Sequence, residues 1–165
     1  SPEKETTATL PTGWINVSGE SVGNWVEAEG RALKVLLANL AQEGVAAKDI
    51  SVITPFQDVR NQLQVMLRPP MVFGTIHTMQ GKESSVVVLV LGGKSGAREW
   101  AVSEPNLVNV AATRAKRRLY VIGDRADWST RPIFREVMHL LPEIRISTPS
   151  IGIQAGGAQA MSSVP

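Results

Sequence analysis

Residues suited to contact phosphate form a polar turn near the middle of the chain. The turn directly precedes the run Val86 to Leu91, which predicts a buried strand because every residue in it is apolar. Proteins of the α/β class place ligand contacts at the edges of such sheets, where a rigid core holds polar turns. The residues of this turn that could contact a ligand are Thr75, His77, Thr78, Gln80, Gly81 and Glu83.

Four of these residues also have an ordinary structural interpretation. The hydroxyl groups of Thr75 and Thr78 suit phosphate oxygens, but threonine also caps turns. His77 could equally be a half-buried histidine whose polar atoms are satisfied. Gly81 would let a ligand approach the backbone closely. Glu83 could accept hydrogen bonds from a ribose, but it could also cap a helix start or form a surface ion pair.

A second candidate is the basic segment 106–117, which is predicted to be helical. At about 100° per residue, Asn109, Thr113 and Lys116 form a polar stripe. Arg114 is offset from this stripe toward Ala111, beside the apolar face, which indicates a specific contact. An arginine directed at a phosphoryl group in transfer stabilises the developing charge, an effect of about 10³–10⁵ in rate. For a single arginine, however, a salt bridge on a helix surface is the commoner arrangement.

The sequence Gly92-Gly93-Lys94-Ser95 follows a predicted strand and resembles the end of a phosphate-binding P-loop. The P-loop motif requires another glycine five residues before the glycine that precedes lysine, and Val88 occupies that position. This segment is therefore predicted to be a mobile basic loop. Asp124 follows another predicted strand, but no P-loop lies upstream of it in this chain. The chain thus has residues to contact a nucleotide, but not the full set to hydrolyse one.

Elements predicted as strands alternate with elements predicted as helices, which favours a mostly parallel sheet with helices on both faces. The predicted strands are 13–18, 50–54, 72–76, 85–91 and 118–122, and the predicted helices are 24–40, 58–67, 105–116 and 133–141. Residues 1–12 are predicted to be disordered, residues 13–142 to form one domain, and residues 143–165 to form a flexible tail.

Composition excludes several classes of protein. The chain has no cysteine, so it has no disulfide framework and no thiolate metal site, and we expect a cytoplasmic location. It has no apolar run near the roughly 18 residues of a membrane span and no visible signal peptide. It also lacks an initiator methionine, as expected of a fragment. A net charge of +2 is too weak by itself to indicate nucleic-acid binding, and the basic residues of the central third could simply form a solvated face.

Three segments together resemble the second RecA-like domain of superfamily 1 helicases. VITPFQDVRNQL is similar to motif IV, GTIHTMQGKESSVVVLV to motif V, and NLVNVAATRAKRRLYVIGD to motif VI. The upstream segment WINVSGESVGNWVEAE resembles the nonsense-mediated-decay branch of that superfamily. The resemblance covers residues 13–142 and implies a three-layer RecA-like α/β domain with a mostly parallel sheet.

The resemblance also implies roles for individual residues. Arg114 would contact the γ-phosphate of ATP as an arginine finger, and Gln80, Gly81 and Glu83 would line the same nucleotide cleft. The nucleic-acid backbone of single-stranded DNA or RNA would be contacted by Thr54, Pro55, Thr75, His77 and Thr78. A first RecA-like domain of the same parent chain would supply the P-loop and hold Mg²⁺. The present chain alone would therefore be inactive and would contain no metal site. We expect no membrane among its partners.

Two positions depart from the family pattern. Leu107 stands where the branch often has arginine, and His77 where it often has aspartate, although histidine is usual in the related repair helicases. The alternative to the motor interpretation is a non-catalytic RecA-like regulatory or interaction module, and the sequence upstream of this chain would distinguish the two. A self-contained small-molecule enzyme fits poorly because no nucleophile is paired with a base. If the chain is a motor domain, we also expect Arg114 to lie along the same rim of the sheet as the turn that follows Ile76.

Overall fold

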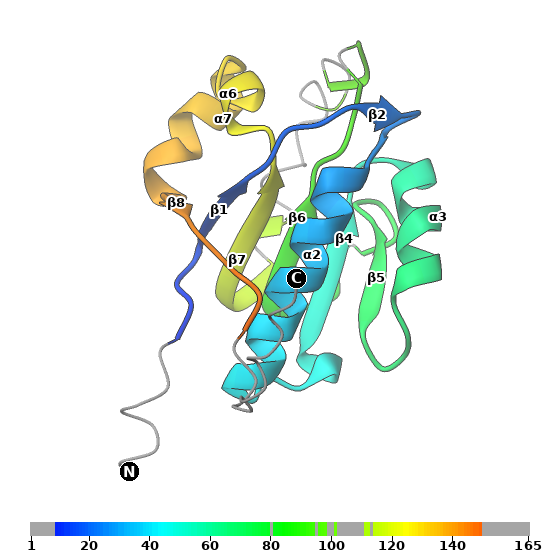
Figure 1. Cartoon of the computed structure of the whole chain (residues 1–165), viewed down its shortest axis with the longest axis vertical. Coiled ribbons are helices and arrows are strands. Elements are labelled where there is room, and N and C mark those ends of the chain that lie inside the picture. The colour runs from blue at the N-terminus through cyan, green and yellow to red at the C-terminus, as the bar shows by residue number, and fades with distance from the viewer. Residues whose placement is uncertain are drawn as a thin grey trace, which may run out of the picture.

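A six-stranded parallel sheet forms the centre of the molecule (Figure 1). The computed structural model describes residues 9–79, 81–94, 96–98, 101, 111–112 and 114–149. The strand order is β5-β4-β6-β7-β1-β8, and every neighbouring pair is parallel. The strands of this sheet are β1 (Gly13–Asn16), β4 (Ile50–Thr54), β5 (Val72–Thr75), β6 (Ser84–Val90), β7 (Ala115–Gly123) and β8 (Glu143–Ile144).

Both faces of the sheet are buried at its centre. Successive strand residues point to opposite faces, and Val52 and Ile53 of β4 are both fully buried. Val87 and Val88 of β6 are buried in the same way. A strand covered on both sides favours apolar residues, which is why β6 is apolar from Val86 to Val90 and β4 carries Ile50, Val52 and Ile53. The buried hydroxyl of Ser51 in β4 is hydrogen-bonded to that of Ser84 in β6. The predicted α/β class is confirmed.

Helix α2 (Glu27–Glu43) crosses one face of the sheet, in front of β4 and β6 in Figure 1. Its apolar stripe of Leu33, Leu36 and Leu40 is fully buried. The helix ends at Gly44, whose φ of 95° is left-handed and whose N–H bonds to the last carbonyls of the helix. Helix α3 (Gln57–Met66) lies beside it and packs against β4 and β5 (Figure 1).

Aromatic side chains anchor the C-terminal elements to the sheet. Trp14 of β1, Trp128 and Phe134 are buried together, with ring centroids of Trp128 and Phe134 separated by 4.9 Å. The indole Nε1 of Trp14 donates to Gly123 O at 2.9 Å and so ties β1 to the end of β7. The elements of this region are α6 (Arg125–Trp128), α7 (Pro132–Val137) and the 3₁₀ helix η2 (Met138–Leu140).

The remaining elements are small. The strands β2 (Ser21–Val22) and β3 (Trp25–Val26) form an antiparallel hairpin that leads into α2. The 3₁₀ helix η1 (Ala47–Asp49) leads into β4.

The structure differs from the sequence predictions at the boundaries of several elements. Strand β7 begins at Ala115, so Lys116 lies in a strand rather than in the predicted helix, because pairing of Ser84 with Ala115 overrides local helix propensity. Most of that predicted helix lies outside the described residues, although Arg114 is helical. Strand β8 extends the sheet into the segment predicted as a flexible tail. Leu10, predicted to be disordered, donates its N–H to Glu43 Oε2 at 2.8 Å.

Candidate nucleotide and nucleic-acid sites

The sheet register places the candidate residues at two opposite edges. We call the edge where the parallel strands begin the amino edge, and the edge where they end the carboxyl edge (the upper edge in Figure 1). Glu83 and Arg114 directly precede β6 and β7, and their neighbours Ser84 and Ala115 pair in register. Both residues therefore lie at the amino edge on adjacent strands. Thr75 ends β5 at the carboxyl edge.

The expectation of a single rim is therefore wrong for the turn after Ile76. Thr75 is level with Thr54 on β4, whereas Val86 is level with Ile50. Thr75 thus lies about six residue levels, or roughly 20 Å, from the start of β6. The segment between β5 and β6 runs from the carboxyl edge to the amino edge, so the motif V residues are divided between two sites.

Arg114 is half-buried at the amino edge, next to the buried Ala111. Its Nε atom is buried and has no hydrogen-bond partner among the described residues. A buried guanidinium N–H without an acceptor is costly, so such groups are usually satisfied by protein, water or ligand. The surface salt bridge, the commoner arrangement for a single arginine, is not seen for Arg114 within the described part of the chain.

Glu83 keeps an accessible carboxylate beside Arg114. Lys116 Nζ lies 3.9 Å from Glu83 Oε1, and the two side chains are 62% and 55% exposed. An exposed pair at this distance is weak, so it leaves the carboxylate available to another donor. Gly81 has a φ of 82°, and a Cβ there would meet no atom within 4 Å, so the backbone conformation, rather than a close neighbour in the protein, accounts for glycine. Gln80 lies outside the described residues.

At the carboxyl edge, two threonines fix the turn after β5. The hydroxyl of Thr78 accepts from the N–H of Thr75 at 3.0 Å and donates to the carbonyl of Thr75 at 3.1 Å. This is the turn-capping role weighed in the sequence analysis. Thr75 is buried, whereas the side chains of His77 and Thr78 are exposed. The turn therefore presents His77 and Thr78 to solvent on a backbone held by Thr75.

The motif IV residues Thr54 and Pro55 lie buried beneath the same edge, and we call them the floor of the carboxyl edge. Thr54 is fully buried and its hydroxyl accepts from the N–H of Phe56 at 3.3 Å. Pro55 is also buried. The carbonyl of Thr54 accepts from the N–H of Ile76 at 3.1 Å, which joins the end of β4 to the turn after β5. Thr54 and Pro55 thus shape the edge and expose little polar surface themselves.

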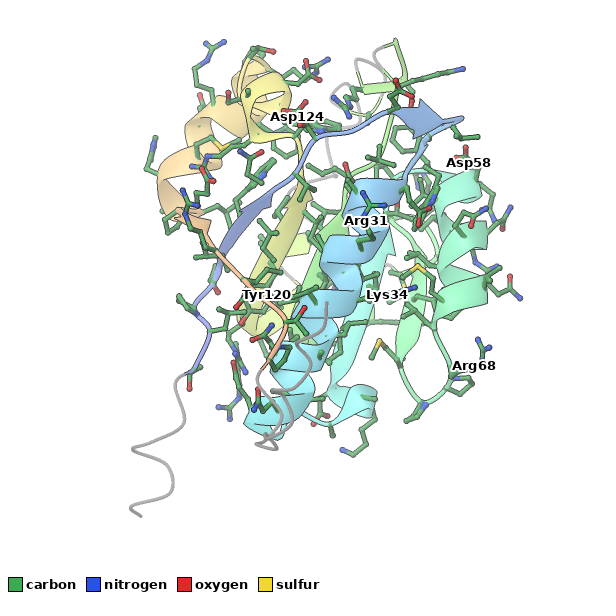
Figure 2. The ribbon with its side chains drawn as sticks, viewed as in Figure 1. Arg31, Lys34, Asp58, Arg68, Tyr120 and Asp124 are labelled. Carbon is green, nitrogen blue, oxygen red and sulfur yellow. The ribbon has the colours of Figure 1, made fainter. Side chains whose placement is uncertain are left out.

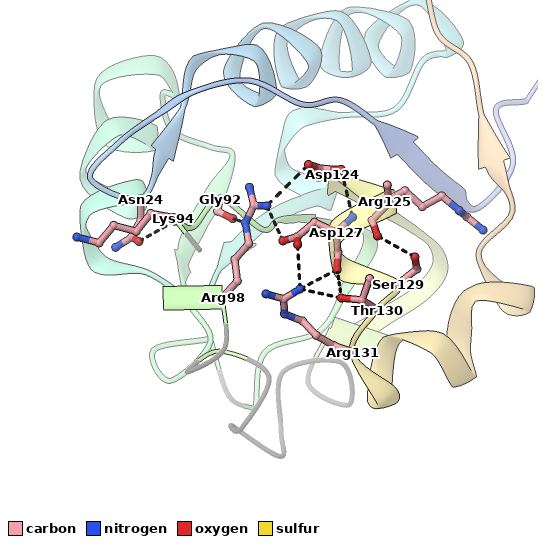
Figure 3. Close-up of polar contacts among 12 residues, drawn as sticks. Asn24, Gly92, Lys94, Arg98, Asp124, Arg125, Asp127, Ser129, Thr130 and Arg131 are labelled. Carbon is pink, nitrogen blue, oxygen red and sulfur yellow. Dashed lines mark hydrogen bonds and ion pairs between the residues drawn. The ribbon is translucent and has the colours of Figure 1, made fainter. Parts of the chain in front are cut away.

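The glycine turn after β6 is not arranged as a P-loop, and hydrogen bonds hold its described part. Gly92 and Gly93 have φ values of 58° and 93°. The N–H of Gly92 donates to Glu29 Oε1 at 2.8 Å, and that of Gly93 to the carbonyl of Asn24 at 2.8 Å. The N–H of Lys94 donates to Asn24 Oδ1 at 3.4 Å (Figure 3). A P-loop offers its amides to phosphate, whereas these three amides are already used by the protein.

Arg98 fixes this turn from its other side. Figure 3 shows its guanidinium between Gly92 and the acidic residues that follow β7. Arg98 Nη1 lies 2.7 Å from Asp127 Oδ2 and 3.8 Å from Asp124 Oδ2, and Arg98 Nε donates to Gly92 O at 3.2 Å. Burial alone would raise the pKa of Asp127, but hydrogen bonds from Arg98 and Arg131 outweigh it and lower that pKa. The turn is thereby attached to the segment that follows β7.

Glu29 is a buried acid that the motif analysis missed. Its side chain is 1% exposed, and its Oε2 atom has no hydrogen-bond partner within the described residues. Burial raises the pKa of Glu29 to about 8, against the opposing effects of the Gly92 N–H and the Arg98 charge. A signal was present in the sequence, because Glu29 lies at helical spacing from Leu33 and Leu36 on the buried face of α2.

A groove of about 650 Å³ lies away from both candidate sites. It is bounded by α2, by β1 and by residues 143–148, and its lining includes Arg31, Val35 and Ile144. None of the candidate residues lines it. In the part of the chain that the structure describes, no group of acidic and histidine side chains is arranged to hold a metal ion, and no helix is long and apolar enough to span a membrane.

The parallel sheet, with polar turns at both edges, is the architecture of a RecA-like nucleoside-triphosphatase domain. A family model described as an AAA domain matches residues 8–126. The chain belongs to this family, the C-terminal RecA-like domain of superfamily 1 helicases of the nonsense-mediated-decay type. The resemblance drawn from the three motifs is confirmed.

Three curated relatives give the family its context. The DNA polymerase alpha-associated DNA helicase A of Schizosaccharomyces pombe is 31% identical over 100 residues, covering 58% of this chain and 15% of that protein. The DNA replication ATP-dependent helicase/nuclease JHS1 of Arabidopsis thaliana is 27% identical over 128 residues, covering 74% and 10%. The DNA-binding protein SMUBP-2 of Rattus norvegicus is 31% identical over 109 residues, covering 64% and 11%. The chain therefore spans 10–15% of the length of these proteins.

Proposed function

We propose that this chain is the second motor domain of an ATP-dependent helicase and that it supplies an arginine finger from its amino edge. The observation that carries the proposal is the position of Arg114, half-buried beside Glu83, with a buried Nε that lacks an acceptor among the described residues. A first RecA-like domain of the same parent protein would bring the P-loop and Mg²⁺. Because this sequence contains no P-loop, the chain alone would not hydrolyse ATP.

The residues at the amino edge fit a nucleotide that a partner lobe presents. The guanidinium of Arg114 would donate hydrogen bonds to the terminal phosphate, and a cation at that position favours the charge that develops during phosphoryl transfer. The exposed carboxylate of Glu83 would accept hydrogen bonds from the ribose hydroxyls. Gly81 and Gln80 would line the same cleft. Arg114 and Glu83 lie on adjacent strands, so one nucleotide could contact both.

The carboxyl edge would contact the single strand. His77 and Thr78 would meet the phosphate backbone, whereas Thr54, Pro55 and Thr75 would hold the edge in shape. Such contacts position a strand without reading its sequence. The three relatives are named for DNA, so single-stranded DNA is the first strand to test, and RNA the second.

The alternative proposal is a non-catalytic RecA-like module for regulation or interaction. It is motivated by the departure from the family pattern at Leu107, where the branch often has arginine. The two proposals differ in what they require of the parent protein, since only the motor needs a P-loop and an acidic pair for Mg²⁺ in the first domain.

The test compares ATP hydrolysis by the parent protein with that of its Arg114→Ala and Arg114→Lys variants. Removing the finger should lower turnover by about 10³–10⁵-fold. Lysine should not restore it, because an ammonium lacks the planar fork of a guanidinium. Nucleotide affinity, measured separately by fluorescence of a labelled ATP analogue, should change little. Arg117→Ala is the matched control, because Arg117 is an exposed arginine on the same segment. Equal turnover in wild type and Arg114→Ala would exclude the finger.

A further inference from the structure

The glycine turn after β6 lies beside the floor of the carboxyl edge. A Cβ on Gly93 would come within 3.0 Å of the Phe56 ring, so the turn packs directly against the residue that follows Thr54 and Pro55. Strand β6 neighbours β4, and β4 neighbours β5. The turns at the ends of these three strands therefore form a continuous row, with His77 and Thr78 at one end and Lys94 at the other.

The backbone that carries Lys94 is held on both sides. Asn24 accepts the N–H groups of Gly93 and Lys94, and Arg98 donates its N–H to the carbonyl of Lys94 at 3.0 Å. The side chain of Lys94 is exposed, and it forms no ion pair within the described part of the chain. A cation on a fixed backbone loses less conformational entropy on binding than one on a mobile loop.

The carboxylate of Asp58 on the neighbouring helix is bonded to other groups. Asp58, at the start of α3 (Figure 2), accepts the backbone and side-chain N–H groups of Asn24 at 2.8 and 3.0 Å. It also accepts the N–H of Val59 at 3.1 Å. Asn24 therefore links Asp58 to the glycine turn, and these three N–H groups occupy acceptor positions of the carboxylate.

We propose that Lys94 binds a backbone phosphate and extends the strand track from β5 and β4 onto β6. This inference rests on the proposed function. The site uses the ammonium group alone, since the amides of the turn are already bonded to Glu29 and Asn24. Binding at Lys94 is therefore electrostatic, independent of base sequence and weakened by salt. Asn24 acts as a positioning residue that fixes the turn.

The test measures binding of the parent protein to a fluorescein-labelled 20-nucleotide single-stranded DNA of mixed sequence between 0.05 and 0.5 M KCl. Losing one phosphate contact should reduce the slope of log affinity against log salt by about 0.7. If wild type and Lys94→Ala bind equally at 1 M salt, this change of slope makes the variant bind about eightfold more weakly than wild type at 0.05 M salt. At 0.2 M salt it binds about threefold more weakly. Lys94→Arg should keep the wild-type slope, and an oligothymidine of the same length should give the same loss.

Lys34→Ala is the matched control, because Lys34 is an exposed lysine on the outward face of α2 (Figure 2). It removes the same charge and should leave the slope unchanged. An unchanged slope for Lys94→Ala, or equal losses in Lys34→Ala and Lys94→Ala, would overturn the phosphate site. If Arg114→Ala abolishes turnover while Lys94→Ala binds normally, only the extension of the track fails. If Lys94→Ala lowers the slope while Arg114→Ala turns over normally, only the finger fails.

Discussion

The free energy of unfolding of the wild-type protein should decrease as pH rises because Glu29 ionises, and the substitution Glu29→Gln should abolish this decrease. Glu29 is 1% exposed, and burial raises its pKa from about 4.5 to about 8. Between these two pH values the folded protein keeps the proton that the unfolded chain releases. The free energy of unfolding contributed by this group is therefore fully present below pH 4.5, and it decreases as pH rises through 8.

The size of the effect follows from the interval between the two pKa values. Each pH unit is worth about 1.4 kcal/mol, so the whole interval amounts to at most roughly 5 kcal/mol. A domain is stable by about 5–15 kcal/mol, so ionising this one carboxyl removes a large part of the total. Glutamine keeps an oxygen for the N–H of Gly92 and does not ionise. Its amide N–H, placed where Oε2 has no partner in the described structure, adds a cost that is independent of pH.

The assay is urea unfolding of wild type and Glu29→Gln at intervals from pH 5 to pH 9, followed by far-UV circular dichroism. The difference in unfolding free energy between the variant and wild type should grow steadily in favour of the variant up to pH 8 and then level off. Glu20→Gln is the control, because Glu20 is an exposed carboxylate and should follow the wild-type curve. Parallel curves for Glu29→Gln and wild type across this range would refute the reasoning.

Two further substitutions test how the edge loops and helix ends are held. Arg98→Met should destabilise the chain by about 1–3 kcal/mol near neutral pH, since it removes the partner of a partly buried carboxylate. Part of this difference from wild type should disappear in acid, because the lowered pKa of Asp127 depends on Arg98, and a difference independent of pH would argue against that pair. Gly44→Ala should cost about 1 kcal/mol in thermal unfolding, because alanine is strained at a φ of 95°. Gly96→Ala, where a Cβ meets no atom within 4 Å, should be neutral, and equal costs at both glycines would contradict the backbone explanation.

The buried strands could be predicted from sequence because a parallel strand covered on both faces has a distinctive composition. Strand β4 was predicted with its observed bounds, and β6 to within one residue at each end. Strand β7 was predicted to begin at Arg118, three residues late, because its first residues, Ala115 to Arg117, are good helix formers with no apolar pattern. Only pairing with β6 makes them extended, and pairing is not visible in a single sequence.

The candidate residues could be named from motifs, but their arrangement could not. The expectation of one rim failed because the levels of two strands depend on sheet register, which the length of the intervening turn does not reveal. The hydrogen bonds that hold the glycine turn could not be predicted, because their partner Asn24 lies about 70 residues away in the sequence. Contacts of that range arise from the tertiary fold rather than from local composition.

The two candidate sites lie on one continuous sheet, so a rotation of the domain as a rigid body moves both sites together. The strands that join the edges are buried on both faces and closely packed, so neither edge can shift independently at low cost. With the edges roughly 20 Å apart, a rotation of roughly 10° about the amino edge carries the carboxyl edge through roughly 3.5 Å. In the proposed motor, a small change of angle against the first domain would therefore produce a displacement comparable to the rise of one nucleotide along a strand, about 3.4 Å.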